Sequence, residues 1–597
     1  MMTPEELSES AQMLMQLDFH DADGKPRPMV FRNPVKILVA NQVDEVKPLL
    51  KELQQGVEAG LYAAGYLSYE AAPAFDPAFR VHCDYAMPLA WFGLFDKPEE
   101  PAAADAEQQG SYQMSDWQPT VDRERYKACI TAIREAIARG ETYQTNYTIR
   151  LRGSFSGDAQ SFYHDLRKRQ HGHYSAYLQV GRYRILSASP ELFFRWKGNT
   201  LTTKPMKGTV KRGRFVAEDR ANAEWLAQSE KNKAENVMIV DLLRNDLGTI
   251  AEIGSVHVPR LFEIERYRTV YQMTSTVEAT TRDETTIEEV FTALFPCGSI
   301  TGAPKVSTMK LIEQLEDSPR EVYCGTIGYI TPQKEAVFNV AIRTVLIDAK
   351  TGAAEYGVGG GITWDSQAED EYDEVVAKSA ILTTDMPAFS LLETMKLVGG
   401  EYDLLDWHLE RLQESAAYFG IPLDRVQLDA ELQAYARKTN ENMRVRLLVS
   451  QQGTIALEGV PLAEQPIVPQ PFAVASRPIA SANPFFYHKT TERSIYQVHK
   501  NEYPDAFDVL LWNERGELTE FTIGNFVVEI DGEKLTPPIT SGLLAGTLRA
   551  ELLAQGAIAE RVLTMDDLTR ATQVWLINSV RGWVPVYRMD DLPSHSA

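Results

Sequence analysis

The chain has 597 residues, of which 44% are hydrophobic, and 60 basic against 83 acidic residues give a net charge of −23. This ordinary globular composition excludes disordered, collagen-like and low-complexity proteins, and the length predicts more than one domain. The charge argues against nucleic acids and anionic membranes as partners, because both repel an acidic surface. An anionic substrate therefore requires a locally basic site.

The N-terminal sequence lacks the basic segment and apolar run of a signal peptide, and no apolar stretch approaches the roughly 18 residues of a membrane span. The four cysteines are far apart and lack metal-binding spacing: Cys83, Cys129, Cys297 and Cys324. We therefore expect a soluble protein of the reducing cytoplasm.

Two stretches divide the chain. Residues 97–110 are rich in alanine, proline and acidic residues and are predicted to form a surface loop. Residues 382–388 follow a charged helical pattern and precede a predicted strand at 389–398. The predicted parts are an N-terminal lobe, a central catalytic domain and a C-terminal domain, at residues 1–110, 111–385 and 386–597.

Between the two breaks, predicted helices and strands alternate. Tyr126, Ile130, Ile133 and Ile137 recur at helical spacing, and Gly140 ends this helix. Apolar runs bounded by turn residues predict strands over residues 178–196, 322–330, 336–348 and 354–362. The pattern predicts a mixed sheet with helices packed on it.

The predicted helix at residues 234–243 carries Glu235 on the same face as Met238, Ile239 and Leu242. Burying an unpaired carboxylate costs several kcal/mol, so Glu235 needs a cation or a proton if it is buried. Considered alone, this helix is better explained by a glutamate at the edge of the apolar face that reaches water.

A second predicted helix, at residues 370–380, lines one face with Glu371, Glu374 and Lys378. Two acidic faces of this kind can meet around Mg²⁺, which takes a few carboxylates together with water and substrate oxygens. Considered alone, this helix is also explained by a solvated face with an ion pair between residues four apart.

Two further features predict anion binding. In the predicted strand at residues 336–346, Arg343 lies on the more polar face, where a guanidinium can bind a carboxylate. The run Gly359, Gly360 and Gly361 offers backbone N–H groups to a second anion, although triple glycine is also common in plain turns.

Six motifs then occur in the order of a known family. Their residues are 140–146, 187–193 with 203–209, 234–247, 298–305, 324–329, and Asp365 with Ser366 leading to Glu371. This series resembles the chorismate-utilising enzymes, the family of anthranilate synthase, isochorismate synthase and aminodeoxychorismate synthase component I.

The resemblance implies roles for these residues. Glu235 and Glu371 match the family's Mg²⁺ ligands, with Glu374 beside them, and Glu191 matches its general acid. Arg343 and the glycine loop match its carboxylate-binding site. Other residues that we expect to contact the substrate are Thr209, Thr326, Tyr329 and Lys378.

Within this family, the position of Lys207 separates the reactions. The related anthranilate and isochorismate enzymes have alanine there, whereas aminodeoxychorismate synthases have lysine. The resemblance implies that the Lys207 amine attacks C2 of chorismate while Glu191 protonates the departing C4 hydroxyl, and that ammonia then enters at C4. Cations beside Lys207 are expected to lower its pKa. The alternative is a surface lysine within a cluster of basic residues.

Two departures from the family pattern stand out. Gln272 replaces a histidine that anthranilate synthase needs for pyruvate elimination, a step that this domain does not require. The N-terminal lobe matches only loosely, so no tryptophan-binding or regulatory site is assigned to it.

The C-terminal domain contains a second ordered set of motifs. They lie at residues 392–395, 408–412, 487–493, 516–526 and 542–547, and a turn at residues 513–516 is predicted to join two strands. The set resembles the class IV, or fold-type IV, pyridoxal phosphate enzymes, which include branched-chain and D-amino acid aminotransferases and aminodeoxychorismate lyase.

The resemblance implies that Lys489 holds the cofactor covalently, Glu520 faces the pyridine nitrogen and Arg411 pairs with the phosphate. Taken singly, Lys489 and Glu520 also fit a surface lysine and a hairpin carboxylate. The domain is trimmed at its start, so a remnant kept for packing stays possible. The phosphate-binding backbone is expected at Ile523, Gly524, Asn525, Gly546 and Thr547.

Together, the resemblances imply a mixed α+β protein in which an anthranilate synthase component I-like domain precedes a D-amino acid aminotransferase-like domain. Its expected product is 4-aminobenzoate for folate synthesis. No cysteine lies in a glutaminase-type Gly-x-Cys-x-Gly turn, so ammonia is expected from solution or from a separate glutamine amidotransferase subunit.

Dimerisation through the C-terminal domain is a family-level expectation. Two alternatives stay open: an anthranilate synthase-like domain fused to a class IV aminotransferase, and a synthase whose C-terminal domain is a non-catalytic interaction module.

Overall fold

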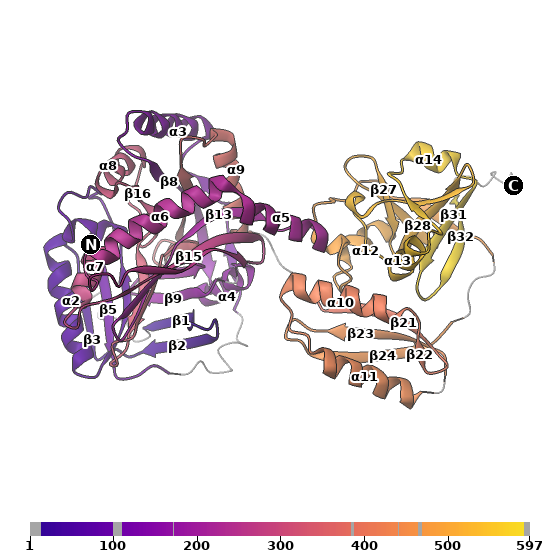
Figure 1. The fold of residues 1–597 in the computed structure, drawn as a ribbon, viewed down its shortest axis with the longest axis horizontal. Helices are drawn as coiled ribbons and strands as arrows, with labels where there is room; N and C mark the ends of the chain where they lie inside the picture. Colours follow the sequence, from indigo (N-terminus) through magenta and orange to yellow (C-terminus); the bar gives the residue numbers. More distant parts are fainter. Residues whose placement is uncertain are drawn as a thin grey trace. The chain divides into compact units, whose positions relative to one another are not determined.

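The computed structural model describes residues 13–99, 110–170, 172–383, 387–439, 441–463 and 468–589. The chain divides into two compact units, Met1–Lys211 with Asn222–Asp385 and Arg212–Ala221 with Met386–Ala597. Most of the predicted loop at 97–110 and the centre of the predicted break at 382–388 lie outside the described residues. Both units mix helices and sheets, as predicted (Figure 1).

The described residues of the first unit form two antiparallel ten-stranded sheets. The first sheet has the order β16 (Gly302–Ala303), β8 (Gln144–Gly157), β20 (Ala353–Ile362), β19 (Thr344–Asp348), β10 (Tyr183–Ser189), β9 (Tyr174–Val180), β1 (Leu14–His20) and β2 (Pro26–Arg32), and β6 (Tyr112–Met114) and β7 (Gln118–Pro119) also pair with β8.

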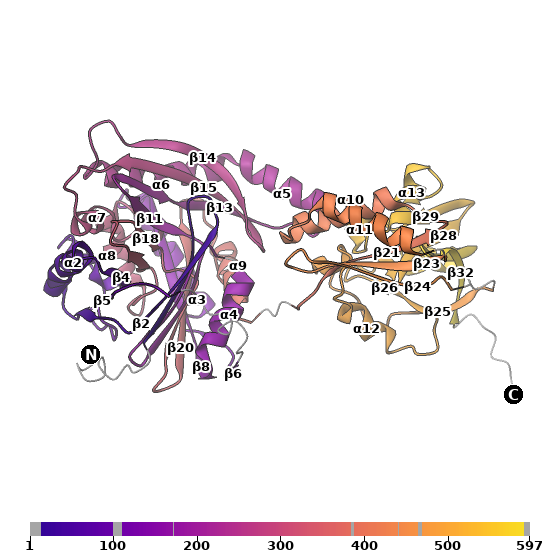
Figure 2. The same ribbon diagram turned by 90° about the horizontal axis from the view of Figure 1, so that it is seen from below.

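The second sheet contains the strand that carries Lys207. Its order is β13 (Met206–Lys211), β15 (Val270–Thr280), β12 (Thr200–Lys204), β11 (Leu192–Lys197), β18 (Ala336–Asn339), β17 (Thr326–Ile330), β4 (Tyr62–Leu67), β5 (Ala90–Phe95) and β3 (Lys36–Ala40), and β14 (His257–Arg266) pairs with β15 (Figure 2). The N-terminal strands therefore belong to both sheets.

Three buried clusters hold these layers together. One contains Leu17 of the first sheet and Tyr66 of the second, so it lies between the sheets. Another packs α2 (Val43–Glu58) and α7 (Ile287–Leu294) on the second sheet. The third packs α3 (Arg123–Ala138) and α4 (Ala159–Gln170) on the first sheet. Each sheet thus buries both of its faces.

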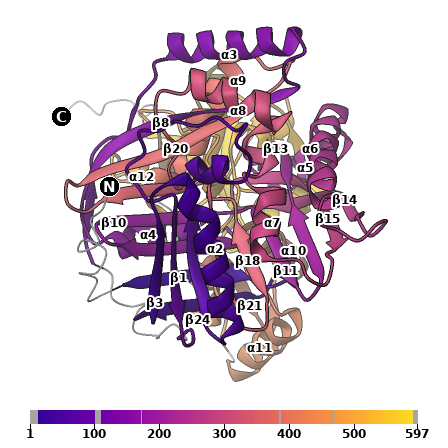
Figure 3. The same ribbon diagram turned by 90° about the vertical axis from the view of Figure 1, so that its left-hand side faces the viewer.

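Two helices of the first unit carry predicted site residues. Helix α6 (Glu230–Gly248) begins where the Ser229 side chain accepts a hydrogen bond from the Asn232 N–H group, and it contacts β13 and β15. It extends beyond the predicted residues 234–243. Helix α9 (Ala368–Ser379) lies beside α3 and against β20, and α8 (Lys305–Leu315) packs on β8 (Figure 3).

The predicted continuous strand at residues 336–346 is wrong. Strand β18 ends at Asn339 in the second sheet, and β19 begins at Thr344 in the first. Because the chain changes sheets here, Arg343 lies in the connection, with a left-handed φ of 54°. The predicted strand at 178–196 is likewise divided into parts of β9, β10 and β11.

The second unit contains two sheets in its described residues. A four-stranded sheet packs against α10 (Leu405–Phe419) and α11 (Arg425–Lys438). Its order is β22 (Glu401–Tyr402), β21 (Leu391–Val398), β23 (Met443–Val449) and β24 (Ile455–Pro461).

The other sheet has eight strands and mixes parallel and antiparallel pairs. Pairing of β27 with β28 closes six strands into a ring, and the predicted turn at 513–516 joins β26 to β27. The order is β27 (Leu518–Phe521), β26 (Asp508–Trp512), β25 (Gln470–Val474), β32 (Gly582–Arg588), β31 (Gln573–Asn578), β28 (Gly524–Ile530), β29 (Glu533–Thr536) and β30 (Ala559–Glu560).

The remaining helices of this unit are α12 (Ser494–Lys500), α13 (Thr547–Ala554) and α14 (Met565–Arg570). Helix α5 (Val216–Gln228) begins in the second unit and ends in the first. Within the described ranges of both units, every helix is too short or too polar to cross a membrane.

Candidate active sites in the two units

A cavity of about 540 Å³ in the first unit brings together most of the residues predicted for chorismate chemistry. They come from β13, α6, β20, α9 and the turns between strands. The predicted residues that line it are Glu191, Lys207, Thr209, Glu235, Arg343, Gly359, Gly360, Gly361, Glu371, Glu374 and Lys378.

Lys207 is held at this cavity by its backbone. The Asn236 side chain on α6 donates a hydrogen bond to the Lys207 carbonyl at 3.4 Å and accepts one from Ser275 Oγ at 2.5 Å. A methyl group on Gly361 would lie 2.6 Å from Lys207 Nζ and 2.2 Å from Gln144 Nε2. The glycine therefore leaves the space that the lysine amine occupies.

The surroundings of Lys207 suit a nucleophile. Burial lowers the pKa of Lys207, and the positive charge of Lys378 adds to this effect, while Glu235 opposes it. A lowered pKa raises the fraction of neutral amine near neutral pH, and only the neutral amine has the electron pair needed to attack carbon.

Glu191 lies between β10 and β11 and is only 4% exposed. Burial raises the pKa of its carboxyl to about 7, although a hydrogen bond from Ser299 and the charge of Lys207 act in the opposite direction. Ser299 Oγ donates to Glu191 Oε1 at 2.7 Å. A carboxyl group with such a pKa can donate a proton near neutral pH. The sequence offered no role for Ser299.

Three carboxylates line the same cavity, but they differ in their partners. Burial raises the pKa of both Glu235 and Glu371. Burial would also raise the pKa of Glu374, but its ion pair with Lys378 brings that pKa below its usual value. Among the residues that the structure describes, no three acidic, histidine or cysteine side chains are grouped to hold a metal ion.

Glu235 and Glu371 are nevertheless a donor pair that fits magnesium. Mg²⁺ usually binds one or two protein carboxylates and completes its shell with water and substrate oxygens. A cation would also relieve the unfavourable burial of these two charges. Because Lys378 neutralises Glu374, we assign Glu374 to the cavity wall and not to the metal pair.

Arg343 and the three glycines form another wall of the cavity. Arg343 Nη1 donates to the Lys378 carbonyl at 3.1 Å, and Lys378 Nζ donates to the Gly359 carbonyl at 2.8 Å. The glycines belong to β20 and pair with β8, so they do not form the predicted loop. This arrangement places two cationic side chains beside a stretch of backbone that lines the cavity, as an anionic substrate requires.

The structure does not bring Thr326 and Tyr329 to the cavity. Thr326 is buried in β17 and donates its hydroxyl hydrogen to the Asn339 carbonyl at 2.5 Å. Tyr329 is buried between the two sheets beside Phe19. Both face core positions, so we leave them out of the site. Thr209 does line the cavity and donates to Gln272 Oε1 at 3.0 Å.

A second cavity, of about 560 Å³, lies in the second unit. It is lined by every residue predicted for cofactor binding: Arg411, Lys489, Glu520, Ile523, Gly524, Asn525, Gly546 and Thr547.

Burial changes the pKa of both Lys489 and Glu520, and for Lys489 the change is in the direction that the predicted chemistry needs. Burial and the charge of Arg411 lower the pKa of Lys489 to about 8. Burial raises the pKa of Glu520 to about 8, although a hydrogen bond from Tyr496 at 2.9 Å opposes the rise. A protonated ring nitrogen opposite Glu520 would place a positive charge beside this carboxyl group and favour its ionised form.

Arg411 is oriented by a buried network that the sequence did not reveal. Its guanidinium donates to both carboxylate oxygens of Glu393, at 2.9 and 2.6 Å. Against the effect of burial, the charge of Arg411 and the contact with His408 lower the pKa of Glu393 to about 2. His408 also lies 2.6 Å from Glu393 and 3.3 Å from Thr547 Oγ1. Glu393 and His408 thus connect the arginine to α13.

The start of α13 forms an anion-binding cradle. Gly546 directly precedes the helix, and a methyl group on it would lie 2.0 Å from Asn525 Oδ1, so a larger residue would displace the Asn525 side chain. The first N–H groups of a helix attract anions, and Arg411 Nη1 donates to the adjacent Ala545 carbonyl at 3.0 Å. This cradle, together with Lys489 and Glu520, fits pyridoxal phosphate.

Four more arginines line this second cavity and had no predicted role: Arg444, Arg446, Arg493 and Arg581. Arg444 and Arg446 are two positions apart in β23, so their side chains point to the same face of the sheet. With Arg411, they make the cavity strongly basic within an acidic chain, which is suited to a ligand with several negative charges.

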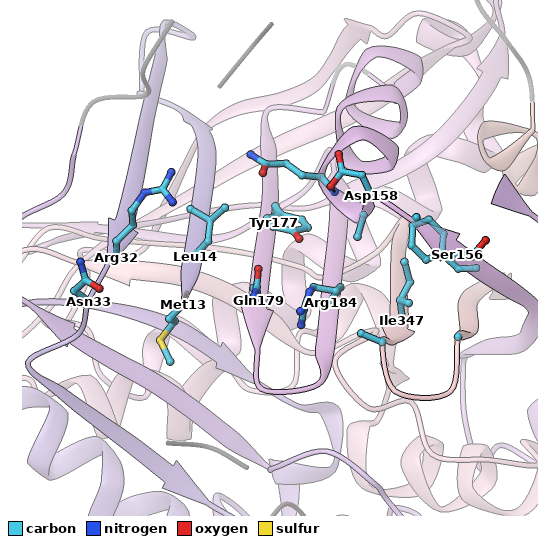
Figure 4. Close-up of a pocket in the computed structure, with 16 residues that line it drawn as sticks. Met13, Leu14, Arg32, Asn33, Ser156, Asp158, Tyr177, Gln179, Arg184 and Ile347 are labelled. Carbon is cyan, nitrogen blue, oxygen red and sulfur yellow. Dashed lines mark hydrogen bonds between the residues drawn. The ribbon is translucent and has the colours of Figure 1, made fainter. Parts of the chain in front are cut away.

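A third cavity, of about 690 Å³, contains no predicted site residue. Figure 4 shows that it is lined by Gln179 of β9, Arg184 of β10 and Arg32 of β2. Arg184 donates to the backbone carbonyls of Gly181 and Tyr183, so its charge is engaged locally. We assign no role to this cavity.

Comparisons with known proteins match both parts of the chain. Residues 19–384 match a family described as chorismate binding enzyme, and residues 390–589 match amino-transferase class IV. Aminodeoxychorismate synthase component 1 of Escherichia coli (strain K12) is 39% identical over 264 residues, which are 44% of this chain and 58% of that protein.

Two further relatives are informative. Aminodeoxychorismate synthase of Streptomyces pristinaespiralis is 43% identical over 256 residues, covering 43% of this chain and 35% of that protein. The crystal structure of anthranilate synthase component I from Streptococcus pneumoniae TIGR4 is 25% identical, with a TM-score of 0.51, and covers 62% of this chain and 90% of that one. The chain thus spans less than two thirds of the two curated relatives.

Proposed function

Because the chain belongs to the chorismate binding enzyme family and also carries an amino-transferase class IV domain, we propose that it converts chorismate and ammonia to 4-aminobenzoate for folate synthesis. The matches confirm both resemblances drawn from the motifs. The observation that carries the proposal is the position of Lys207, whose amine lies in the first cavity together with Glu191 and Arg343.

In the proposed first step, Arg343, Lys378 and the β20 backbone bind the carboxylates of chorismate. The Lys207 amine forms a bond to C2 while the C4 hydroxyl, protonated by Glu191, leaves as water. Ammonia then forms a bond to C4, and the bond between C2 and Lys207 breaks to give 4-amino-4-deoxychorismate. This covalent route divides one difficult substitution into two easier ones.

We include Mg²⁺ in this proposal, with Glu235 and Glu371 as its protein ligands. A bound magnesium ion would neutralise substrate carboxylate charge in a cavity that is already lined by four glutamates. Exclusion of water by the cavity walls would strengthen the contacts of Arg343 and Glu191 with the substrate.

The proposed second step takes place in the C-terminal domain, which we assign to residues 386–597, after the synthase domain at 111–385. Pyridoxal phosphate, when bound, supplies an electron sink for loss of a proton from the carbon that carries the amine. Lys489 takes that C4 proton, and Glu520 keeps the cofactor's ring nitrogen protonated. Pyruvate leaves from C3, and the ring becomes aromatic.

The ammonia source belongs to the proposal as well. We propose a separate glutamine amidotransferase subunit as the partner that supplies ammonia to the first cavity, and a homodimer formed through the second unit. Titrating such a subunit into the assay is expected to raise glutamine-dependent turnover. An absence of any gain would contradict the partnership while leaving the ammonium-dependent reaction intact.

The test supplies the purified chain with chorismate, Mg²⁺, pyridoxal phosphate and an ammonium salt, and identifies the products by chromatography. The expected products are 4-aminobenzoate and pyruvate in equal amounts. Formation of anthranilate would overturn the assignment of the first step. Accumulation of 4-amino-4-deoxychorismate with no aromatic product would show that the C-terminal domain is a non-catalytic module.

Replacing Ser299 with alanine is expected to move the alkaline limb of synthase kcat/KM to higher pH. Glu191 must be protonated to act as an acid, so the rate falls as the pH rises through its pKa, which is about 7. The Ser299 hydroxyl stabilises the ionised carboxylate, and its removal therefore raises that pKa. Initial rates across the pH range measure the shift.

The matched control is Ser307→Ala, because the Ser307 hydroxyl donates to the Pro304 carbonyl at the start of its own helix, away from Glu191. Its pH profile is expected to match that of the unmodified chain. An unchanged alkaline limb in Ser299→Ala would show that Glu191 is not the acid that controls the rate.

A further inference from the structure

The segment Arg212–Ala221 directly follows the strand that carries Lys207, yet it is part of the second unit. Its sequence lies far from the other residues of that unit, which begin at Met386. Its contacts with Tyr418 and Tyr487 therefore lie within the second unit.

A buried ion pair fixes the shape of this segment. The Arg212 guanidinium donates two hydrogen bonds of 2.7 Å to the carboxylate of Asp219, and the two side chains are only 5% and 8% exposed. The Gly213 N–H group donates to the same carboxylate at 2.9 Å. A side chain at Gly213 would lie 2.1 Å from the Asp219 nitrogen, so the turn requires glycine.

The folded segment contacts Tyr418, which lies near the end of α10. Arg212 donates to the Tyr418 carbonyl at 3.1 Å, and its guanidinium lies 4.4 Å from the centre of the tyrosine ring. The Tyr418 hydroxyl donates in return to the Gly213 carbonyl at 2.9 Å. Cation–π contacts and hydrogen bonds of this kind are strongest when they are shielded from water.

Tyr418 in turn contacts His488, the residue before Lys489. The ring of His488 stacks on the Tyr418 ring with a centre-to-centre distance of 4.2 Å, and His488 is 4% exposed. His488 Nδ1 also lies 3.0 Å from Ser415 Oγ, so both the ring plane and one ring nitrogen are fixed by α10.

The next residue back along the chain, Tyr487, contacts the segment directly. Phe215 stacks on the Tyr487 ring at 5.4 Å, and Arg214 Nη1 donates to the Tyr487 hydroxyl at 3.1 Å. On the other side of Lys489, the Lys489 carbonyl accepts from the Leu392 N–H group at 3.0 Å, and Thr491 pairs with Ser390. The backbone that carries Lys489 is thus held from both ends.

We propose that this segment positions Lys489 through four of its side chains, supplied to the C-terminal site by the sequence of the synthase half: Arg212, Arg214, Phe215 and Asp219. The inference depends on the proposed function only in taking Lys489 as the residue that holds pyridoxal phosphate. Without this segment, Tyr487 loses its contacts with Phe215 and Arg214, and Tyr418, on which His488 stacks, loses its contacts with Arg212 and Gly213. The backbone before Lys489 then gains freedom.

The test uses the full chain with Phe215→Ala. The apoenzyme is titrated with pyridoxal phosphate, and amide hydrogen exchange is measured in peptides that cover residues 484–491. We expect the Kd for pyridoxal phosphate to rise about tenfold and exchange to accelerate in these peptides. The pH midpoint of the bound cofactor's absorbance is also expected to shift. Phe215→Tyr, which keeps the aromatic ring, is expected to restore all three.

Arg220→Ala is the matched control, because Arg220 lies in the same segment but is exposed. Arg214→Ala removes the hydrogen bond to Tyr487, the ion pair with Glu218 and the cation–π contacts with the Phe215 and Tyr487 rings, and serves if Phe215→Ala does not fold. Unchanged cofactor affinity and exchange in both Phe215→Ala and Arg214→Ala would overturn the inference. If the unmodified chain binds no pyridoxal phosphate, the proposed function fails instead.

Discussion

Replacing Lys207 with alanine is expected to lower the rate of 4-amino-4-deoxychorismate formation by about three orders of magnitude or more. Alanine removes the nucleophile but leaves the carboxylate-binding groups Arg343 and Lys378 in place. Ammonia would then have to substitute at C4 in one step. The rate is measured with saturating chorismate, Mg²⁺ and an ammonium salt.

A second readout follows from the covalent route. Incubating the unmodified chain with chorismate in the absence of ammonia is expected to add a group to Lys207, detectable by peptide mass spectrometry, and Lys207→Ala should not be labelled. The control Lys211→Ala removes an exposed lysine of the same strand and is expected to keep full activity. Full synthase activity in Lys207→Ala would exclude the covalent route.

Replacing Lys489 with alanine is expected to stop 4-aminobenzoate formation while 4-amino-4-deoxychorismate accumulates. Lys489 provides both the attachment point for the cofactor and the base, so a loss of about three orders of magnitude is expected in the second step. Chromatography of the reaction mixture distinguishes the two compounds, and the absorbance of covalently bound cofactor is expected to disappear.

Lys438→Ala is a suitable control for this variant, because Lys438 is an exposed lysine at the end of α11. Its product ratio is expected to equal that of the unmodified chain. Continued production of 4-aminobenzoate by Lys489→Ala at the original rate would contradict the assignment of the second site.

The motifs predicted most residues of both cavities because each motif is a short, continuous piece of chain whose chemistry is visible in its own sequence. Arg343 is an example that the sequence pattern did not predict correctly. Its alternating apolar neighbours predicted a continuous strand, but the chain leaves one sheet and enters another at this point. Periodicity records local burial and carries no information about which sheet receives a strand.

The residues that sequence reasoning missed act through distant partners. Ser299 reaches Glu191 across 108 positions of the chain, and Glu393 reaches Arg411 only because β21 packs on α10. Glu393 and His408 both lie in motifs of the C-terminal domain, but these motifs did not indicate that the two residues support Arg411. The contact of Phe215 with Tyr487 within the second unit had no signal in the sequence at all.

The division of the N-terminal strands between both sheets has a consequence for synthesis on the ribosome. Strand β4, which ends at Leu67, pairs on one edge with β5 and on the other with β17, which begins only at Thr326. At typical translation rates, β17 is completed roughly 13 to 50 s after β4. During that interval, one edge of β4 has no native partner and presents unpaired backbone groups. The nascent chain is therefore most prone to misassembly before β17 pairs with β4 and completes the second sheet.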